Sequence, residues 1–132
     1  MIFFLLQLID KKTLEKFDPS GMHDAYDSWP QIAKDVFNSK FDPVDFKEID
    51  HVVFSEMGGS GTIGDLFSSI LSKTNIHTTV VKGYVLPKTV DDNTLVITTS
   101  VFGNTVETLS ILESASKLNC KIIGFSSGGL ME

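Results

Sequence analysis

A small-residue turn, Met57-Gly58-Gly59-Ser60-Gly61-Thr62, stands directly after the apolar run at residues 51–54. A second turn of this kind, Ser100-Val101-Phe102-Gly103-Asn104-Thr105, follows residues 95–99. Each turn is expected to open a helix, whose free backbone N–H groups and positive dipole end suit an anion. Turns on neighbouring parallel strands would meet at one edge of the sheet, where open α/β proteins bind ligands. The two turns therefore predict a phosphorylated small molecule as the ligand.

This half of the chain alternates between strand and helix patterns. Strands are predicted at residues 51–55, 77–82, 95–99 and 121–125, and helices at 60–71 and 104–118. Three of these strands are almost wholly apolar, as expected when helices cover both faces of a sheet, whereas residues 77–82 are more polar and are placed nearer an edge. Strand–helix repeats of this length force right-handed crossovers. The predicted fold is α/β, a three-layer α-β-α sandwich with a parallel, flavodoxin-like sheet.

The chain is predicted to divide into an N-terminal helical segment, residues 1–45, and an α/β domain, residues 46–132. The first of these begins with an apolar stretch at residues 2–9. That stretch is too short to span a membrane, and it lacks the basic start and the cleavage site of a secretory signal. It is expected to be a strand or a helical turn docked on the domain or on a partner, and no membrane association is expected.

Two helices are predicted in the N-terminal segment, at residues 10–18 and at about 22–37. Ser20 is the predicted cap of the second helix. Pro30 is expected to kink that helix or divide it in two, because the residue before a proline resists the α conformation. Apolar side chains recur at helical spacing and predict a packing face. They are Tyr26, Trp29, Ile32, Ala33, Val36 and Phe37.

Composition argues against several functions. The 132 residues carry a net charge of −6, and all 11 basic residues are lysines. Nucleic-acid binding needs a basic face, so no nucleic-acid partner is expected. Without arginine, a bound phosphate must depend on backbone N–H groups, hydroxyls and a lysine. Cys120 is the sole cysteine, so no intrachain disulfide can form, and we expect a core thiol in a reducing, cytoplasmic compartment.

The first turn also matches the dinucleotide-binding pattern G-x-G-x-x-G, from Gly59 to Gly64. That pattern requires an acidic residue after the next strand to hold the ribose hydroxyls, and here Lys82 stands at that place. A lysine would suit the 2′-phosphate of NADP, but the second turn would then have no role. An NADP-binding domain is therefore kept as an alternative. A Walker-type nucleotide-binding loop is excluded, because no Gly-Lys-Ser/Thr follows the glycines.

A phosphate without a nucleotide accounts for both turns. Ser60 and Thr62 could donate hydroxyls from the first turn, and Ser100 and Thr105 from the second. Ser127, in a third small-residue turn, could reach the same place. The competing interpretation is that these residues are ordinary helix caps and tight turns.

We nominate no catalytic and no metal-binding residue. Asn104 is the predicted N-cap of the second helix, with Glu107 completing a capping box. His23, His51 and His77 fall at predicted helix or strand starts, where packing or surface roles are expected.

Five spaced segments carry further information. They include Tyr26-Asp27-Ser28-Trp29-Pro30, Phe54-Ser55-Glu56-Met57-Gly58-Gly59-Ser60-Gly61, Val81-Lys82-Gly83-Tyr84-Val85-Leu86-Pro87, Ser100-Val101-Phe102-Gly103-Asn104-Thr105-Val106-Glu107-Thr108-Leu109 and Ser126-Ser127-Gly128-Gly129. In this order they resemble the first of the two sugar isomerase (SIS) domains of the archaeal-type bifunctional phosphoglucose/phosphomannose isomerases. The resemblance covers residues 20–130.

The resemblance implies a homodimer with a five-stranded parallel sheet that binds glucose 6-phosphate, mannose 6-phosphate or fructose 6-phosphate without a cofactor. Gly59 and Ser60 match first-loop residues near the substrate of that family. Ser100 and Thr105 match phosphate-binding residues of its second loop. Relative to the family, the chain is expected to be truncated at its C-terminus, where the last strand of the sheet would lie.

Two residues depart from the family pattern. Phe102 replaces a serine of the second loop, which removes a hydroxyl donor and adds bulk. Glu56 stands where the family usually has glycine and brings negative charge close to an anion site. The glutamate base and the ring-opening histidine of the family belong to segments that follow those matched here.

The sequence therefore predicts a sugar-phosphate-binding SIS domain of a glucose-6-phosphate/mannose-6-phosphate isomerase, which in full-length relatives interconverts aldose and ketose phosphates. The alternative is a non-catalytic SIS-derived binding or dimerisation module. Whether this chain is itself an enzyme is left open.

Overall fold

The computed structural model describes residues 10–132, so the expectation for residues 2–9 falls outside the described residues. The chain divides into two compact units, Met1–Val44 and Asp45–Glu132. Each unit is described below by itself.

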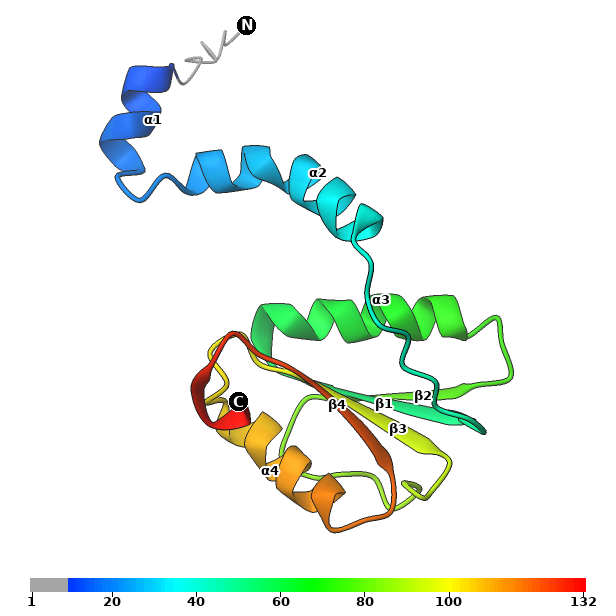
Figure 1. The fold of residues 1–132 in the computed structure, drawn as a ribbon. Helices are drawn as coiled ribbons and strands as arrows, with labels where there is room; N and C mark the ends of the chain where they lie inside the picture. Colours follow the sequence, from blue (N-terminus) through cyan, green and yellow to red (C-terminus); the bar gives the residue numbers. More distant parts are fainter. Residues whose placement is uncertain (1–9) are drawn as a thin grey trace, which may run out of the picture. The chain divides into compact units, whose positions relative to one another are not determined.

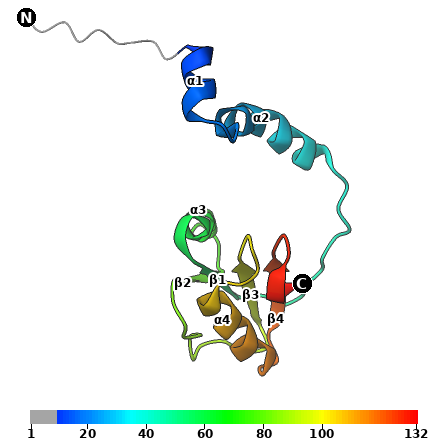
Figure 2. The ribbon, with the colours of Figure 1, turned by 90° about the vertical axis from the view of Figure 1, so that its left-hand side faces the viewer.

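The second unit is built on a four-stranded, wholly parallel sheet with strand order β2-β1-β3-β4 (Figure 1). The strands are β1 (His51–Glu56), β2 (His77–Val81), β3 (Thr94–Thr99) and β4 (Lys121–Phe125). The helices α3 (Gly61–Leu71) and α4 (Val106–Ser116) lie on opposite faces of the sheet (Figure 2). The predicted α/β fold is confirmed, and β2, the more polar strand, is an edge strand as expected.

The hydrophobic core lies between the sheet and α4. Val53 and Val96 project from the two central strands against Ile111 and Ala115 of α4, and Leu86 closes the cluster. All of these side chains are buried, and β1 is buried along its whole length. Continuous apolar strands fold in this way when both of their faces are covered.

The face of the sheet toward α3 is less completely covered. An apolar cavity of about 550 Å³ opens there, with Phe54 of β1, Phe67 of α3, Ile97 of β3 and Phe125 of β4 in its wall. Leu95, Ile97 and Thr99 of β3 are only half-buried on this face, whereas Thr94, Val96 and Thr98 on the other face are buried. The two faces of the sheet therefore differ sharply in how much apolar surface they leave accessible.

In the first unit, the described residues form two helices, α1 (Lys11–Phe17) and α2 (Met22–Asn38). Pro30 lies inside a single α2, so the prediction that it could divide this segment into two helices is wrong. Pro30 cannot bond the carbonyl of Tyr26, but Tyr26 is exposed, so water can satisfy that carbonyl. The rings of Tyr26 and Trp29 lie 4.6 Å apart, and no residue of α2 is buried in the described part of the chain.

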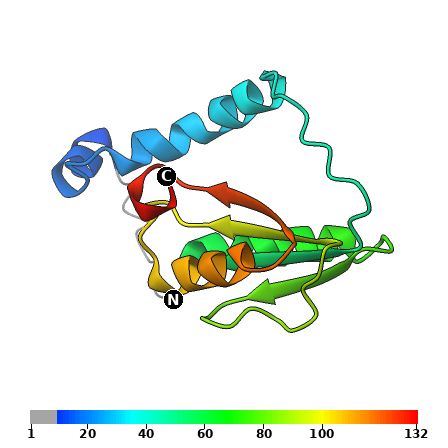
Figure 3. The same ribbon diagram turned by 60° about the horizontal axis from the view of Figure 1, so that its bottom comes forward.

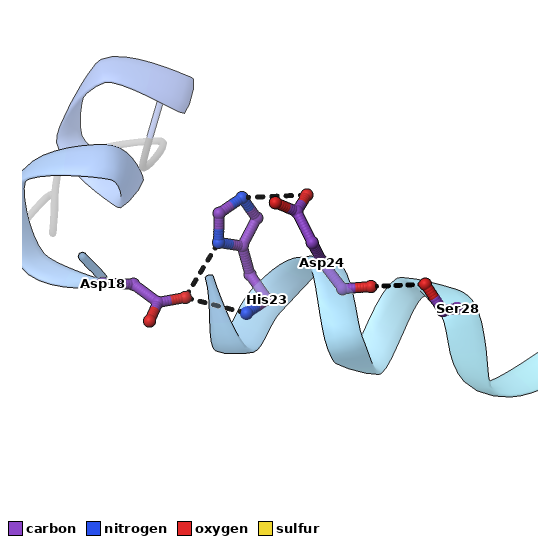
Figure 4. Close-up of polar contacts among 4 residues, drawn as sticks. All are labelled: Asp18, His23, Asp24 and Ser28. Carbon is purple, nitrogen blue, oxygen red and sulfur yellow. Dashed lines mark hydrogen bonds and ion pairs between the residues drawn. The ribbon is translucent and has the colours of Figure 1, made fainter. Parts of the chain in front are cut away.

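The start of α2 differs from the prediction that Ser20 caps it. Gly21 occupies the N-cap position in the left-handed conformation, with φ +67°, which glycine adopts without strain. The Asp18 carboxylate instead accepts hydrogen bonds from the backbone N–H and from Nδ1 of His23, both at 2.8 Å (Figure 4). The backbone and ring hydrogen bonds from His23 lower the pKa of Asp18 to about 2. The bond to Asp18 in turn raises the pKa of His23 above its usual value.

Candidate functional site

Three loops gather at the carboxyl edge of the parallel sheet (Figure 3). The first, residues 57–60, joins β1 to α3 and includes a short 3-10 turn, Gly58–Ser60. The second, residues 100–105, joins β3 to α4. The third, residues 126–130, follows β4. Because β1 and β3 are paired neighbours, the first two loops leave the sheet side by side, as the sequence predicted.

The second and third loops are locked together by hydrogen bonds. The Ser127 N–H donates to the Val101 carbonyl at 3.0 Å, and its hydroxyl donates to the same oxygen. The Leu130 N–H donates to Asn104 Oδ1 at 3.1 Å. Asn104 is therefore not the N-cap of α4, and that prediction is wrong, because its side chain binds the third loop instead. The N-cap is Thr105.

Two glycines make this close approach possible. Gly103 has φ +65°, and a Cβ atom there would lie 1.7 Å from the Gly128 carbonyl oxygen. Gly129 has φ +82°, and its Cβ would lie 2.3 Å from the Phe102 carbonyl oxygen. Any larger residue at either position would force the backbones of the two loops apart. The second and third loops are therefore in close backbone contact at both glycines.

Ser100 and Thr105, the two predicted phosphate-binding residues of the second loop, are brought together. Their hydroxyl oxygens lie 2.8 Å apart in a hydrogen bond. Ser100 is buried, with 3% of its surface exposed, whereas Thr105 is half-buried. One hydroxyl donates to the other, so the hydroxyl that accepts keeps its own hydrogen for a further acceptor. This leaves a donor at the start of α4.

The hydroxyls do not act as ordinary helix caps. Ser60 is the N-cap of α3 and Thr105 the N-cap of α4, yet neither side chain makes a capping hydrogen bond within residues 10–132. The first N–H groups of a helix have no intrahelical partner, and a cap normally satisfies them. Neither hydroxyl therefore acts as a side-chain cap. Within the described residues, the start of α4 keeps a positive dipole end without one, whereas at the start of α3 the Glu56 carboxylate accepts a hydrogen bond from the Gly64 N–H.

Gly59 and Ser60, the predicted first-loop residues, lie at the carboxyl end of β1. Gly59 is exposed, and a Cβ there would meet open space. Ser60 is half-buried, and Thr62 lies in the first turn of α3 and is exposed. The first loop thus presents small residues and hydroxyls beside the second, which is what close approach of a polar ligand requires.

Phe102 does not fill the second loop. The residue is 80% exposed, so its ring is not packed inside the loop. The ring of Phe102 therefore leaves the interior of the second loop unfilled.

Glu56 is buried, with 1% of its surface exposed, and it has donors of its own. Its carboxylate accepts a hydrogen bond from the Gly64 N–H at 3.0 Å and another from the Thr99 hydroxyl at 3.2 Å. The carboxylate thus ties the end of β1 to α3 and to the end of β3. The side chain of Glu56 therefore lies close to the loops, but it is buried and hydrogen-bonded within the fold.

Sequence reasoning missed two contacts at this edge. Lys82, the first residue after β2, forms an ion pair with Asp65 of α3, with 2.6 Å between Nζ and Oδ2. The Glu107 carboxylate lies beside the Tyr84 hydroxyl and raises the pKa of that tyrosine, whereas Glu107 had been predicted to complete a capping box. The position of Lys82 directly after a predicted strand was the sequence feature that could have placed it at this edge.

The two histidines of the α/β unit and Cys120 lie away from this edge. His51 and His77 pair across the first residues of β1 and β2, at the opposite end of the strands, with ring centroids 4.8 Å apart. Burial, and secondarily the charge of His77, lowers the pKa of His51. Cys120 packs against the core as expected, and burial raises the pKa of its thiol. Among residues 10–132 no group of three His, Cys, Asp or Glu side chains could hold a metal ion.

Comparison with known proteins identifies relatives of the chain. It is 42% identical over 87 residues to a bifunctional phosphoglucose/phosphomannose isomerase of Caldicellulosiruptor bescii, a match that covers 65% of the chain and 26% of that protein. The enzyme of the same name from Aquifex aeolicus is 39% identical over 115 residues, which are 85% of the chain and 32% of the relative. The chain thus spans about a quarter to a third of the length of the curated relatives it matches. No protein-family model matches it.

Solved structures agree on the fold. A protein assigned as a phosphosugar isomerase from Bacillus subtilis matches with a TM-score of 0.54 and 28% identity, over 62% of the chain and 27% of that protein. The sugar isomerase domain of an RpiR transcription factor from Sphaerobacter thermophilus matches with a TM-score of 0.54 and 20% identity, over 63% of the chain and 49% of that structure. The α/β unit therefore has the sugar isomerase fold. In addition, no helix in the described part of the chain is long and apolar enough to cross a membrane.

Proposed function

Because the chain is a partial homologue of the bifunctional phosphoglucose/phosphomannose isomerases, we propose that its SIS domain binds a hexose 6-phosphate at the carboxyl edge of the sheet. The ligand class is glucose 6-phosphate, mannose 6-phosphate or fructose 6-phosphate. No cofactor and no nucleic acid takes part, and the domain works as a homodimer in the cytoplasm.

The observation that carries this proposal is the pair of hydroxyls on the second loop. Ser100 and Thr105 lie 2.8 Å apart at an uncapped helix start, and the third loop fixes their backbone. In the proposed complex the phosphate replaces this mutual hydrogen bond and accepts from both hydroxyls and from the first N–H groups of α4. The sugar then extends over Gly59 and Ser60 of the first loop.

Aldose–ketose isomerisation needs a base that moves a proton between C1 and C2. We assign no residue of this chain to that step. The proposed role of the chain in the reaction is to bind and orient the sugar phosphate.

A second candidate function is an SIS-derived interaction module without catalysis. The observation that favours it is the apolar cavity of about 550 Å³ on the α3 face of the sheet, where Phe67 and Phe125 are exposed. A partner chain that covered this face would bury substantial apolar surface. The NADP alternative draws on the G-x-G-x-x-G pattern of the first turn and on Lys82 and leaves the second loop without a role.

Calorimetric titration with fructose 6-phosphate tests the binding proposal. We expect the parent chain to bind, and Ser100→Ala and Thr105→Val each to weaken binding about 10- to 150-fold, since a hydrogen bond to a charged group contributes roughly 1.5–3 kcal/mol. Phe102→Ser should strengthen binding by restoring a donor. Ser116→Ala is the matched control, because its hydroxyl bonds only the Glu113 carbonyl at the far end of α4.

Three results would contradict the proposal. They are no heat of binding in either the parent or the Phe102→Ser variant, equal competition by inorganic phosphate, and displacement of the sugar phosphate by NADP. The last of these would favour the dinucleotide alternative. Failure of binding together with a stable dimer in solution would favour the interaction module.

A further inference from the structure

Lys82 differs in charge from the other residues at the carboxyl ends of the strands. Of the residues that immediately follow the four strands in the α/β unit, it alone is basic. Lys88, later in the same connection, lies with Lys117 and Leu118 beyond the C-terminal end of α4. An edge that is to hold an anion therefore has one mobile cation available, and that cation belongs to β2.

The stem of Lys82 lies against the first loop. A Cβ atom at Gly61 would be 3.0 Å from Cε of Lys82 and 3.7 Å from its Nζ. Gly61 is buried, so the lysine covers it where a larger residue would push the side chain away. The ammonium group is thereby held over the beginning of α3, beside Gly61.

The present partner of Lys82 can be exchanged. Its ion pair with Asp65 is short, at 2.6 Å, but the two side chains are 49% and 57% exposed. Exposed ion pairs contribute about 0–1 kcal/mol, because solvent screens them. An anionic group of a ligand over the first loop could therefore recruit this ammonium group at little cost.

The distance across the sheet determines which part of the ligand Lys82 can reach. Neighbouring strands lie about 4.8 Å apart, so β2 and β3, which flank β1, are separated by about 10 Å. A lysine side chain is shorter than that and cannot reach a phosphate held by Ser100 and Thr105. An extended six-carbon sugar phosphate has a comparable length, which places its C1 end over the first loop, beside Lys82.

We infer that Lys82 is a specificity-determining residue that binds the C1 end of the ligand and makes the site prefer sugar phosphates with a negatively charged group at C1. This inference rests on the proposed function, because the phosphate must occupy the second loop for C1 to face Lys82. Asp65 holds the lysine in place when no ligand is bound.

Two probes that differ only at C1 test the inference. 6-Phosphogluconate has a carboxylate there, and sorbitol 6-phosphate has an uncharged alcohol. By calorimetry we expect the parent chain to bind 6-phosphogluconate about ten-fold more tightly, the increment of one hydrogen bond to a charged group. Lys82→Gln should bring the ratio of the two affinities close to one and leave the affinity for sorbitol 6-phosphate nearly unchanged.

Two further variants sharpen the comparison. Lys117→Gln removes an ion pair to Glu113 of the same 2.6 Å length at the far end of α4, and the preference for 6-phosphogluconate should persist. Asp65→Asn frees Lys82 and removes a competing carboxylate, so the preference should increase. Added salt should reduce the preference in the parent but not in Lys82→Gln.

The outcomes separate the two proposals. If both probes bind the parent and Lys82→Gln keeps the same ratio as Lys117→Gln, the inference about Lys82 is wrong and the sugar-phosphate site stands. If the parent binds neither probe nor fructose 6-phosphate, both proposals are overturned. If only 6-phosphogluconate binds, and Ser100→Ala does not weaken it, the ligand is held as an anion by Lys82 without the second loop, which also contradicts the arrangement inferred here.

Discussion

Replacing Gly103 by alanine should be the most damaging glycine substitution in the candidate site. The position has φ +65°, and the new Cβ would lie 1.7 Å from the Gly128 carbonyl oxygen and 2.6 Å from the Ser126 hydroxyl. The left-handed conformation alone costs a non-glycine residue about 1–2 kcal/mol. Relief of the clash must also separate the second and third loops, because the nearest atom belongs to backbone.

That separation gives the magnitude. It breaks at least the hydrogen bonds from Ser127 to Val101 and from Leu130 to Asn104, each with a net contribution of about 0.5–1.5 kcal/mol. Together with the conformational cost, Gly103→Ala should reduce the free energy of unfolding by about 3 kcal/mol. The same change should abolish binding of fructose 6-phosphate, since Ser100 and Thr105 flank the displaced residues.

Two glycines of the first loop provide graded controls. Gly58 has φ +61° but open space around it, so Gly58→Ala should cost only the conformational term of about 1–2 kcal/mol. Gly59 has neither a positive φ nor a neighbour within 4 Å, so Gly59→Ala should change stability by no more than about 0.5 kcal/mol. Urea unfolding followed through the amide NMR signals of β1 and β3 measures all three. Equal costs for Gly103→Ala and Gly58→Ala would refute the interlocked loops.

Three further results are expected. Thr108 has a fully buried hydroxyl without a partner in the described structure, so Thr108→Val should stabilise the chain by about 1 kcal/mol. Thr94→Val loses hydrogen bonds to Asp91 and should destabilise the chain by about 1–3 kcal/mol. Thermal unfolding measures both variants, and the opposite order of stability would contradict this reasoning. The lowered pKa of His51 means that its neutral form is favoured in the fold, so stability should be constant above about pH 6.5 and fall as pH drops toward the lower folded-state pKa, and His51→Gln should flatten this part of the profile. NMR titration should place the pKa of Asp18 at about 2 and the pKa of His23 above its ordinary value. The stabilisation from this pair should then be lost as the pH falls toward 2 and as it rises through the pKa of His23. Ordinary pKa values for both residues would exclude the hydrogen bonds at the start of α2.

The sheet was predictable because its signals are local and agree with each other. The strand predicted at residues 121–125 is β4 itself, and the others agree within one or two residues with β1, β2 and β3. Apolar strands separated by helix-length segments admit few arrangements, so the parallel order followed from the chain itself. The more polar composition of β2 was enough to place it at an edge.

The errors fell where a residue bonds a distant segment. Asn104 is a residue type typical of N-caps, yet its side-chain Oδ1 accepts a hydrogen bond from the N–H of Leu130, which follows β4 in the chain. Ser20 has the hydroxyl of a typical cap, but the left-handed Gly21 occupies the N-cap position and the Asp18 carboxylate accepts from the His23 N–H. Such choices depend on which tertiary partner is within reach, and single-sequence patterns do not include that information.

The site was predicted only in part, because some of its features depend on contacts between distant segments. Hydroxyls after two strands indicated the carboxyl edge, and Ser100 and Thr105 do meet there. The orientation of Phe102 and the inward position of Glu56 could not be read from residue types, because each depends on the space left by other elements. Lys82 was noted as standing in place of an acidic residue and as suited to the 2′-phosphate of NADP. Its contact with Asp65 was not predicted, because the two residues are seventeen positions apart and belong to different elements.

The locking of the third loop onto the second also gives the edge strand β4 a part in the site. β4 pairs with the rest of the sheet through β3 alone, so, like β2 at the other edge, it is a strand from which local opening can begin. Each time β4 detaches, the carbonyl of Gly128 and the N–H of Ser127 withdraw, and the segment carrying Ser100 and Thr105 loses the wall that shapes it. The time for which Ser100 and Thr105 keep the geometry that binds a ligand is then set by the local opening of β4, a strand that does not itself contact the ligand. A bound phosphate would slow that motion in return, and the chain would be most rigid when the site is full.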